Sequence, residues 1–198
     1  MSEICVFSIQ AYRELGDRLC QLGGWRRGQV EVQQFPDGER YQRVLCSVMG
    51  RTVILLGGTC DDHCTLELFD LANQLANEAR SLTLVIPYFG YSTMERATRP
   101  GEVVTARTRA RLISSIPTCE AGSRVFLFDL HTDGIEFYFG DGHVTHHLYG
   151  APLITSLIKQ VMGDRSFVLG ATDAGRALVR QMVAMAELTR KGHAAGDL

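Results

Sequence analysis

Short apolar segments rich in β-branched residues alternate along this chain with longer segments of helical periodicity, and this alternation most limits the folds open to it. The expected strands cover residues 4–9, 52–57, 82–87, 124–130 and 166–169. The expected helices cover residues 11–22, 63–79, 105–116, 151–162 and 174–188. The order favours βαβ crossovers, and therefore an α/β fold with a mostly parallel central sheet and helices on both faces. In the first helix, Leu15, Leu19 and Leu22 fall on one face.

The composition is that of an ordinary globular protein, with 45% hydrophobic and 21% charged residues. The formal net charge of -2 gives no overall attraction to nucleic acid or to anionic membranes. No apolar run has the length of a membrane span, and the N-terminus lacks the pattern of a signal peptide. We therefore expect no nucleic acid and no membrane among the partners.

Six cysteines are present: Cys5, Cys20, Cys46, Cys60, Cys64 and Cys119. Five of them lie in or beside apolar segments, and no second Cys/His pair at zinc-ligand spacing accompanies Cys60 and Cys64. We interpret them as buried reduced thiols, which indicates a reducing, cytoplasmic location.

Four segments follow the expected strands, where parallel sheets gather their binding residues. These segments are residues 57–59, 87–96, 129–131 and 170–175. The third is Asp129-Leu130-His131, in which the two polar residues stand two apart and, on a strand, point to the same face. They could share a cation or a magnesium-bound phosphate, with the imidazole acting through a water or a phosphate oxygen. The alternative is a histidine that caps the strand.

The sequence Phe35-Pro36-Asp37-Gly38-Glu39 stands between extended segments at residues 30–34 and 41–48, which predicts a hairpin-like flap. Pro-Asp-Gly is a turn signature, and a plain turn explains those three residues. Phe35 and Glu39 are not required by the turn. A phenyl ring can stack on a nucleobase and a carboxylate can accept from an exocyclic amine, so a nucleotide contact is the other interpretation.

The long segment at residues 88–102 is rich in Gly, Pro and charge and is predicted to be a loop. Its Arg96 and Arg99 suit phosphate contacts, although a solvated charged loop explains them equally well.

The turn at residues 170–176 precedes an expected helix, so its backbone amides could bind an anion. Asp173 is also well placed as the helix N-cap, a role compatible with ligand binding.

Three histidines, His143, His146 and His147, stand close together. Without acids or cysteines at ligand spacing, they indicate a surface strand or turn rather than a metal site.

The order and spacing of four motifs resemble the ribose-phosphate pyrophosphokinase (PRPP synthetase) family over roughly residues 4–185. The motifs are residues 35–39, Val85–Tyr91, Asp129–His131 and Thr172–Gly175. Residues 138–141 and Glu95-Arg96 are similar to one subclass of that family.

This resemblance implies two phosphoribosyltransferase-like domains, with residues 1–147 forming the first and residues 148–198 beginning an incomplete second. It implies a dimer-based homo-oligomer, often a hexamer, that transfers diphosphate from Mg-ATP to the 1-hydroxyl of ribose 5-phosphate. The products are PRPP and AMP, and the cofactor is Mg²⁺. The implied site residues are Phe35, Asp37, Gly38, Glu39 and Arg96 for ATP; Asp173 for the ribose phosphate; Asp129, His131 and Asp173 for the metal; and His131 for catalysis.

The chain departs from the family at two places. Thr93-Met94 stands where most members carry Arg-Gln, and Arg96 is the hypothetical replacement. The family's later catalytic Lys/Arg loop and its Thr-Gly-Gly-Thr ribose-phosphate loop are not found in the 198 residues. We therefore expect this chain, as written, not to complete the reaction. The alternative function is a non-catalytic, regulatory PRPP-synthetase-like subunit; a plain phosphoribosyltransferase has no need of the flap.

Overall fold

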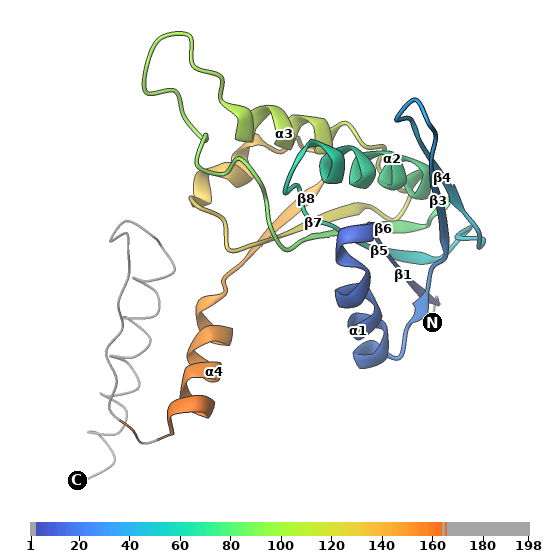
Figure 1. The fold of residues 1–198 in the computed structure, drawn as a ribbon, viewed down its shortest axis with the longest axis horizontal. Helices are drawn as coiled ribbons and strands as arrows, with labels where there is room; N and C mark the ends of the chain where they lie inside the picture. Colours follow the sequence, from blue (N-terminus) through green and yellow to red (C-terminus); the bar gives the residue numbers. More distant parts are fainter. Residues whose placement is uncertain (1–2, 164, 166–198) are drawn as a thin grey trace. The chain divides into compact units, whose positions relative to one another are not determined.

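A six-stranded, mostly parallel sheet forms the centre of the first of the two units into which the chain divides after His147 (Figure 1). The structure is a computed structural model that describes residues 3–163 and 165, and each unit is described by itself. The sheet order is β2-β1-β5-β6-β7-β8, and the pairs from β2 through β7 are parallel. Its strands are β1 (Ile4–Ser8), β2 (Arg26–Arg27), β5 (Thr52–Leu56), β6 (Ser81–Ile86), β7 (Ser123–Phe128) and β8 (Val144–Leu148).

Helices cover both faces of this sheet, as the alternation predicted. The helices of this unit are η1 (Gln10–Tyr12), α1 (Arg13–Gly23), α2 (Asp62–Glu78), α3 (Thr105–Ser114) and η2 (Asp133–Tyr138). The crossover through α1 runs from β1 to β2, whereas those through α2 and α3 run in the opposite direction, towards β7. Because parallel crossovers are right-handed, α1 must lie on one face and α2 and α3 on the other, as Figure 1 shows.

The core lies on both sides of the central strands, which are buried on both faces and therefore read as continuous apolar runs. From α2 it receives Leu68, Leu71, Ala72, Leu75 and Ala76. From the strands it receives Cys5, Phe7, Val53, Leu55, Leu82, Leu84, Ile86, Val125 and Leu127. Each large aliphatic or aromatic side chain buried in this way contributes about 1.5–3 kcal/mol.

The first helix turns its leucines outward. Leu15 and Leu22 are exposed, the latter at 88%, while Gly16 and Cys20 are the buried residues of α1. The reason is close packing: a Cβ on Gly16 would lie 3.1 Å from the Cβ of Ser8. The helix therefore approaches β1 along its small residues, which leaves Leu15 and Leu22 on the surface and Leu19 partly buried.

A second, separate sheet is formed by β3 (Val30–Gln34) and β4 (Arg40–Val44), which pair antiparallel and confirm the predicted hairpin. The loop at residues 88–102 is also confirmed, because no helix or strand is assigned there.

In the second unit, α4 spans Ala151–Met162, as predicted, with Pro152 in its first turn and Gly163 after its end. The strand expected at residues 166–169, the helix expected at residues 174–188 and the turn around Asp173 lie outside the described residues. Within residues 3–163 and 165, no helix combines the length and the hydropathy needed to span a membrane.

Candidate functional site

The ends of the parallel strands are tied to one another through backbone hydrogen bonds. Gly57 N donates to Val85 O at 3.0 Å, and Thr59 N donates to Tyr88 O at 3.0 Å. The segments that follow β5 and β6 therefore run side by side at the carboxyl edge of the sheet, where α/β proteins place their ligands.

Two glycines allow close packing at this edge of the sheet, one between these two segments and one against η1. Gly90 N donates to the buried Thr59 Oγ1 at 2.7 Å, and a Cβ on Gly90 would overlap the Thr59 carbonyl oxygen. A Cβ on Gly58 would likewise overlap the hydroxyl of Tyr12. The hydroxyl of Tyr12 lies 3.4 Å from Cys60 Sγ, and burial raises the pKa of this phenol, so it stays protonated.

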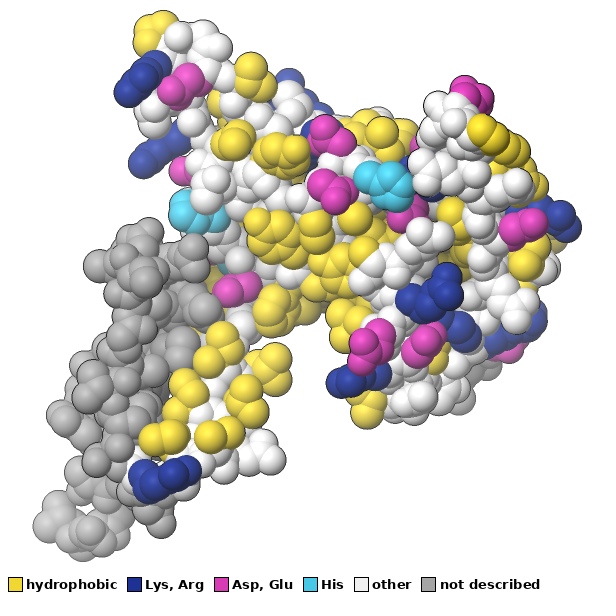
Figure 2. All heavy atoms as spheres, in the orientation of Figure 1, with side chains coloured by type: hydrophobic (Ala, Val, Ile, Leu, Met, Phe, Trp, Pro, Cys, Tyr) yellow, Lys and Arg dark blue, Asp and Glu magenta, His cyan; other side chains and the backbone are white. Residues whose placement is uncertain are grey.

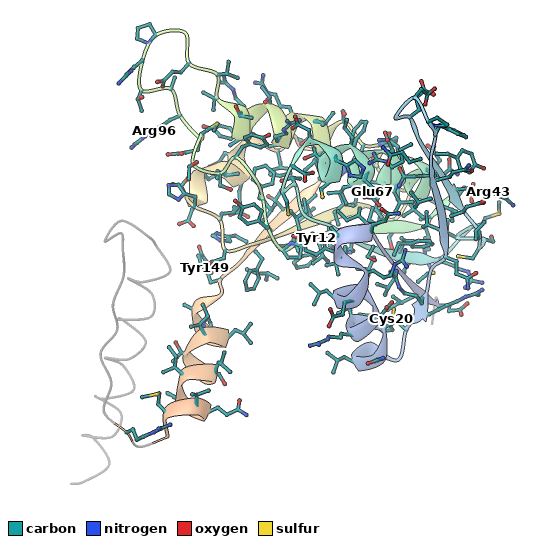
Figure 3. The ribbon with its side chains drawn as sticks, viewed as in Figure 1. Tyr12, Cys20, Arg43, Glu67, Arg96 and Tyr149 are labelled. Atoms are coloured by element: carbon teal, nitrogen blue, oxygen red, sulfur yellow. The ribbon has the colours of Figure 1, made fainter. Side chains whose placement is uncertain are left out.

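A buried carboxylate joins the end of β1 to α2. Glu67 is 2% exposed and accepts a hydrogen bond from Gln10 N at 2.9 Å (Figure 3). Sequence reasoning missed this residue. The signal was present, because Glu67 stands four and eight residues before Leu71 and Leu75 and so lies on the buried face of its helix.

The Asp129-Leu130-His131 motif does not lie on a strand, which corrects the argument that its two polar residues share a strand face. β7 ends at Phe128, and Asp129 has a left-handed backbone with φ of 51°. A turn therefore sets the side-chain directions. His131 is exposed, and Leu130 N donates to His147 Nε2 at 2.9 Å.

The expectation of surface histidines at 143–147 is wrong for two of the three. His143 is 5% exposed, and the side chain of His147 is 4% exposed. His146, the partly buried third, stacks on Phe126 with ring centroids 4.7 Å apart. The alternation of side chains in β8 separates His146 from His147.

The hairpin tip uses some of its predicted site residues to make the turn. Phe35 N donates to Glu39 O at 2.8 Å, and the side chain of Asp37 accepts from Glu39 N at 3.1 Å. Gly38 has a φ of 93°, which favours glycine. Phe35, Asp37, Gly38 and Glu39 are all exposed. Figure 2 shows hydrophobic and acidic side chains together at this projecting tip.

An arginine fastens the hairpin to α2. Arg40 Nη1 donates to His63 O at 3.1 Å, and Nη2 donates to Asp70 Oδ2 at 3.4 Å. A groove of about 540 Å³ lies beside this anchor, lined by residues of β4 and α2 that include Gln42 and Gln74. Arg40 pairs with Gln34 at the last step of the β3–β4 ladder, so this anchor fixes the end of the hairpin that carries the turn, and Phe35 and Glu39 stay exposed beyond it.

The long loop after β6 is held at its base and projects beyond it. Tyr91 donates its hydroxyl to Asp62 Oδ1 at 3.1 Å, and the guanidinium of Arg109 lies 5.0 Å over the Tyr91 ring and pairs with Asp62. Arg96 belongs to the projecting part (Figure 3), where it is mostly exposed and its Nε lies 3.6 Å from Glu95 Oε1.

Within one chain the structure brings only some of the predicted site residues together. Figure 1 places η2, which follows the Asp129–His131 turn, on the far side of the unit from the hairpin tip. Arg96 lies on the projecting loop, and Asp173 lies outside the described residues.

Comparison with known proteins agrees with this architecture. Residues 4–116 match the family described as the N-terminal domain of ribose phosphate pyrophosphokinase. The chain is similar to "Ribose-phosphate pyrophosphokinase 2, chloroplastic" of Oryza sativa subsp. japonica, with 31% identity over 97% of this chain and 50% of that protein. It is 34% identical to "Ribose-phosphate pyrophosphokinase" of Rhodopirellula baltica, over 85% of this chain and 53% of that protein.

The fold is also similar to a crystal structure of phosphoribosylpyrophosphate synthetase from Mycobacterium smegmatis. The TM-score is 0.77 at 26% identity, over 93% of this chain and 61% of that chain. The chain spans about half the length of the curated relatives it matches. The family match at residues 4–116 covers more than half of the 198-residue chain, so this protein belongs to the ribose-phosphate pyrophosphokinase family.

Proposed function

We propose that this chain supplies the ATP-binding part of a ribose-phosphate diphosphokinase, which transfers diphosphate from Mg-ATP to the 1-hydroxyl of ribose 5-phosphate. The observation that carries the proposal is the hairpin tip. Asp37 and Gly38 make the turn, whereas the side chains of Phe35 and Glu39 are exposed beside them. In a chain of this family, that pair offers a ring to stack on adenine and an acceptor for its amino group.

The nucleotide is proposed to bind between two chains. The hairpin tip and η2 lie on opposite sides of the unit in the view of Figure 1, which favours a site completed by a second chain. A homo-oligomer in which the tip reaches the strand ends of its neighbour resolves this separation. Symmetric dimers, which assemble further into hexamers in the manner implied by the family resemblance, are the simplest arrangement of this kind.

The phosphate end of the site is proposed to lie at the Asp129–His131 turn. The donor set fits Mg²⁺, because the carboxylate of Asp129 is a hard oxygen ligand and His131 is exposed for a water or a phosphate oxygen. Asp173 would complete the metal and ribose contacts. Magnesium, when bound, neutralises charge on the transferred phosphate groups. Arg96, on its projecting loop, is proposed to add a positive charge near the phosphates.

Titration of the 198-residue chain with Mg-ATP by calorimetry tests the proposal. We expect saturable binding that weakens about tenfold in Glu39→Gln, because the amide oxygen still accepts but a hydrogen bond to a neutral group is weaker than one to a carboxylate by about 1–1.5 kcal/mol. Glu31→Gln is the matched control, since Glu31 lies on the same hairpin but pairs with Arg43. Equal affinities for all three proteins, or no binding at all, contradict the proposal.

A second candidate is a non-catalytic subunit that assembles with active partners. Thr93 and Met94, both exposed, favour it because neither side chain can replace a guanidinium at the triphosphate. Release of AMP in the presence of ribose 5-phosphate, followed with the full-length gene product, separates the two candidates: a catalytic subunit releases AMP and a regulatory one binds ATP without turnover.

A further inference from the structure

We propose that His147 is the positioning residue of the turn that carries Asp129 and His131. The inference rests on the function proposed above, because it assigns a role at the same phosphate and metal site. His147 comes from β8, which follows the turn in the chain, and touches neither the metal nor the phosphates in this proposal.

The imidazole of His147 holds the turn through its backbone. Leu130 N donates to Nε2 at 2.9 Å, in the middle of the motif. An amide is always a donor, so Nε2 must carry its lone pair, and the proton of the neutral ring is then on Nδ1. Nδ1 lies 3.1 Å from Asp133 Oδ1, which suits a proton at that nitrogen. The ring is therefore held through Nε2 and has a carboxylate beside its other nitrogen.

The turn requires such support because its backbone is unfavourable. Asp129 has a φ of 51°, in the left-handed region that non-glycine residues seldom adopt. The next amide, that of Leu130, belongs to a residue that is 5% exposed, so water is not a ready replacement for the imidazole. Without Nε2, the turn would lose the bond that stabilises its left-handed entry, and Asp129 and His131 would lose their set orientation.

The adjacent histidine supplies a control. His146 lies on the other side of β8 and stacks on Phe126, with an angle of 19° between the rings. A change at His146 alters the same strand and the same residue type without touching Leu130. Glutamine at position 147 is the conservative replacement, because its side-chain oxygen can accept a hydrogen bond near the place of Nε2.

NMR on the ¹⁵N-labelled full chain tests the inference. In the wild type we expect the ¹⁵N shifts of His147 to show the proton on Nδ1. We expect the Leu130 amide to exchange about tenfold faster in His147→Leu and at the wild-type rate in His147→Gln and His146→Leu. A wild-type ring with its proton on Nε2 overturns the inference, as does an unchanged Leu130 exchange rate in His147→Leu. If His147→Leu does not fold, the position of the proton on the wild-type His147 ring and the Leu130 exchange rate in His147→Gln still decide the question.

Mg-ATP titration of the same proteins gives the functional readout. Partners that orient a metal ligand typically contribute 10- to 100-fold in affinity, so His147→Leu is expected to bind Mg-ATP about tenfold more weakly, with rescue in His147→Gln. Equal Mg-ATP affinity in His147→Leu and wild type overturns the positioning role. If the wild type itself binds no Mg-ATP while the NMR results hold, the proposed function fails and the hydrogen bond to Leu130 stands.

Discussion

His143 is buried in the first unit with neither ring nitrogen hydrogen-bonded to any part of the chain that the structure describes. A buried polar group without a partner costs about 1–3 kcal/mol relative to a satisfied one. Replacing it with an apolar side chain of similar size removes that cost. We expect His143→Leu to raise the free energy of unfolding by about 1 kcal/mol, measured by urea denaturation at pH 7.5. A loss of stability would show that the imidazole has an unrecognised partner.

The same histidine gives the protein a defined pH dependence. Burial lowers the pKa of His143 below its ordinary value of 6.5. As the pH falls below 6.5, His143 is therefore protonated in the unfolded chain but not in the folded chain. The free energy of unfolding decreases until the pH passes the pKa of the folded state. We expect the stability difference between His143→Leu and wild type to grow from pH 7.5 to pH 5. A constant difference across this range would contradict the assignment.

Thiol reactivity is expected to follow burial. Burial raises the pKa of the Cys64 thiol to about 11, and that of Cys5 also to about 11, whereas Cys60 is exposed. Thiolates react and thiols do not, so iodoacetamide at pH 8 should label Cys60 first and leave the other two unmodified in the folded protein. Mass spectrometry of tryptic peptides gives the order. Early labelling of Cys5 would mean that β1 opens.

At this scale the sequence predicts kinds of residue better than their surroundings. The spacing of Phe35, Asp37 and Glu39 indicated a turn with two side chains to spare, and the tip has that arrangement. The burial of His147 was not predictable, because a polar residue in a short edge strand indicates a surface position, and His143, which follows Asp141-Gly142 just before β8, gives the same indication. Which histidine turns inward depends on the register of β8 and on an amide more than a dozen residues earlier.

Among the elements, the loops that follow β5 and β6 are packed so closely that one methyl group is enough to separate them. A Cβ on Gly90 would overlap the backbone oxygen of Thr59, which cannot move without the strand end. We expect Gly90→Ala to destabilise the protein by about 2–3 kcal/mol, the usual cost of overpacking, and to lower its thermal midpoint. Gly134→Ala is the control, because no atom lies within 4 Å of the added Cβ. Equal midpoints for the two variants would contradict the packing argument.

Element positions followed well from periodicity and turn chemistry, and their inward faces followed less well. The hairpin, α2 and α4 lie within a few residues of their expected bounds. In α1, however, the leucine stripe predicted an apolar face, and packing instead selected Gly16 and Cys20. Periodicity shows that a helix has an apolar stripe, but the distance to the neighbouring strand decides which stripe is buried.

For the whole molecule, the alternation of strands and helices was enough to predict a mostly parallel α/β sheet but not its strand order. The two-residue strand β2 lies beside β1 on the side away from β5, so the crossover through α1 runs in the other direction and α1 packs on the opposite face. No sequence pattern marks β2 as a strand. A single chain also gives no indication of which chain's hairpin serves which site, because that depends on contacts between copies. The ATP, metal and ribose-phosphate contacts, including that of Asp173, therefore stay predictions.

A shared site makes a prediction that a self-contained site does not. If the hairpin tip serves a neighbour, a dimer formed from one Glu39→Ala chain and one His131→Ala chain has one site with both defects and one with none. Refolding the two variants together should therefore restore Mg-ATP binding to about a quarter of the sites. Calorimetric stoichiometry measures that fraction. No restoration on mixing would indicate that tip and turn act within one chain.

The hydrogen bond from Leu130 to His147 also has a consequence for the order of events during synthesis. The ribosome completes β7 and the turn that follows it before it has added His147, so the emerging polypeptide carries all five parallel strands while the turn still lacks its acceptor. β8 therefore completes the sheet and also supplies the hydrogen-bond acceptor for the turn of the proposed site. In a nascent chain, the turn that is proposed to bind the phosphates therefore gains this acceptor only once β8 has left the exit tunnel.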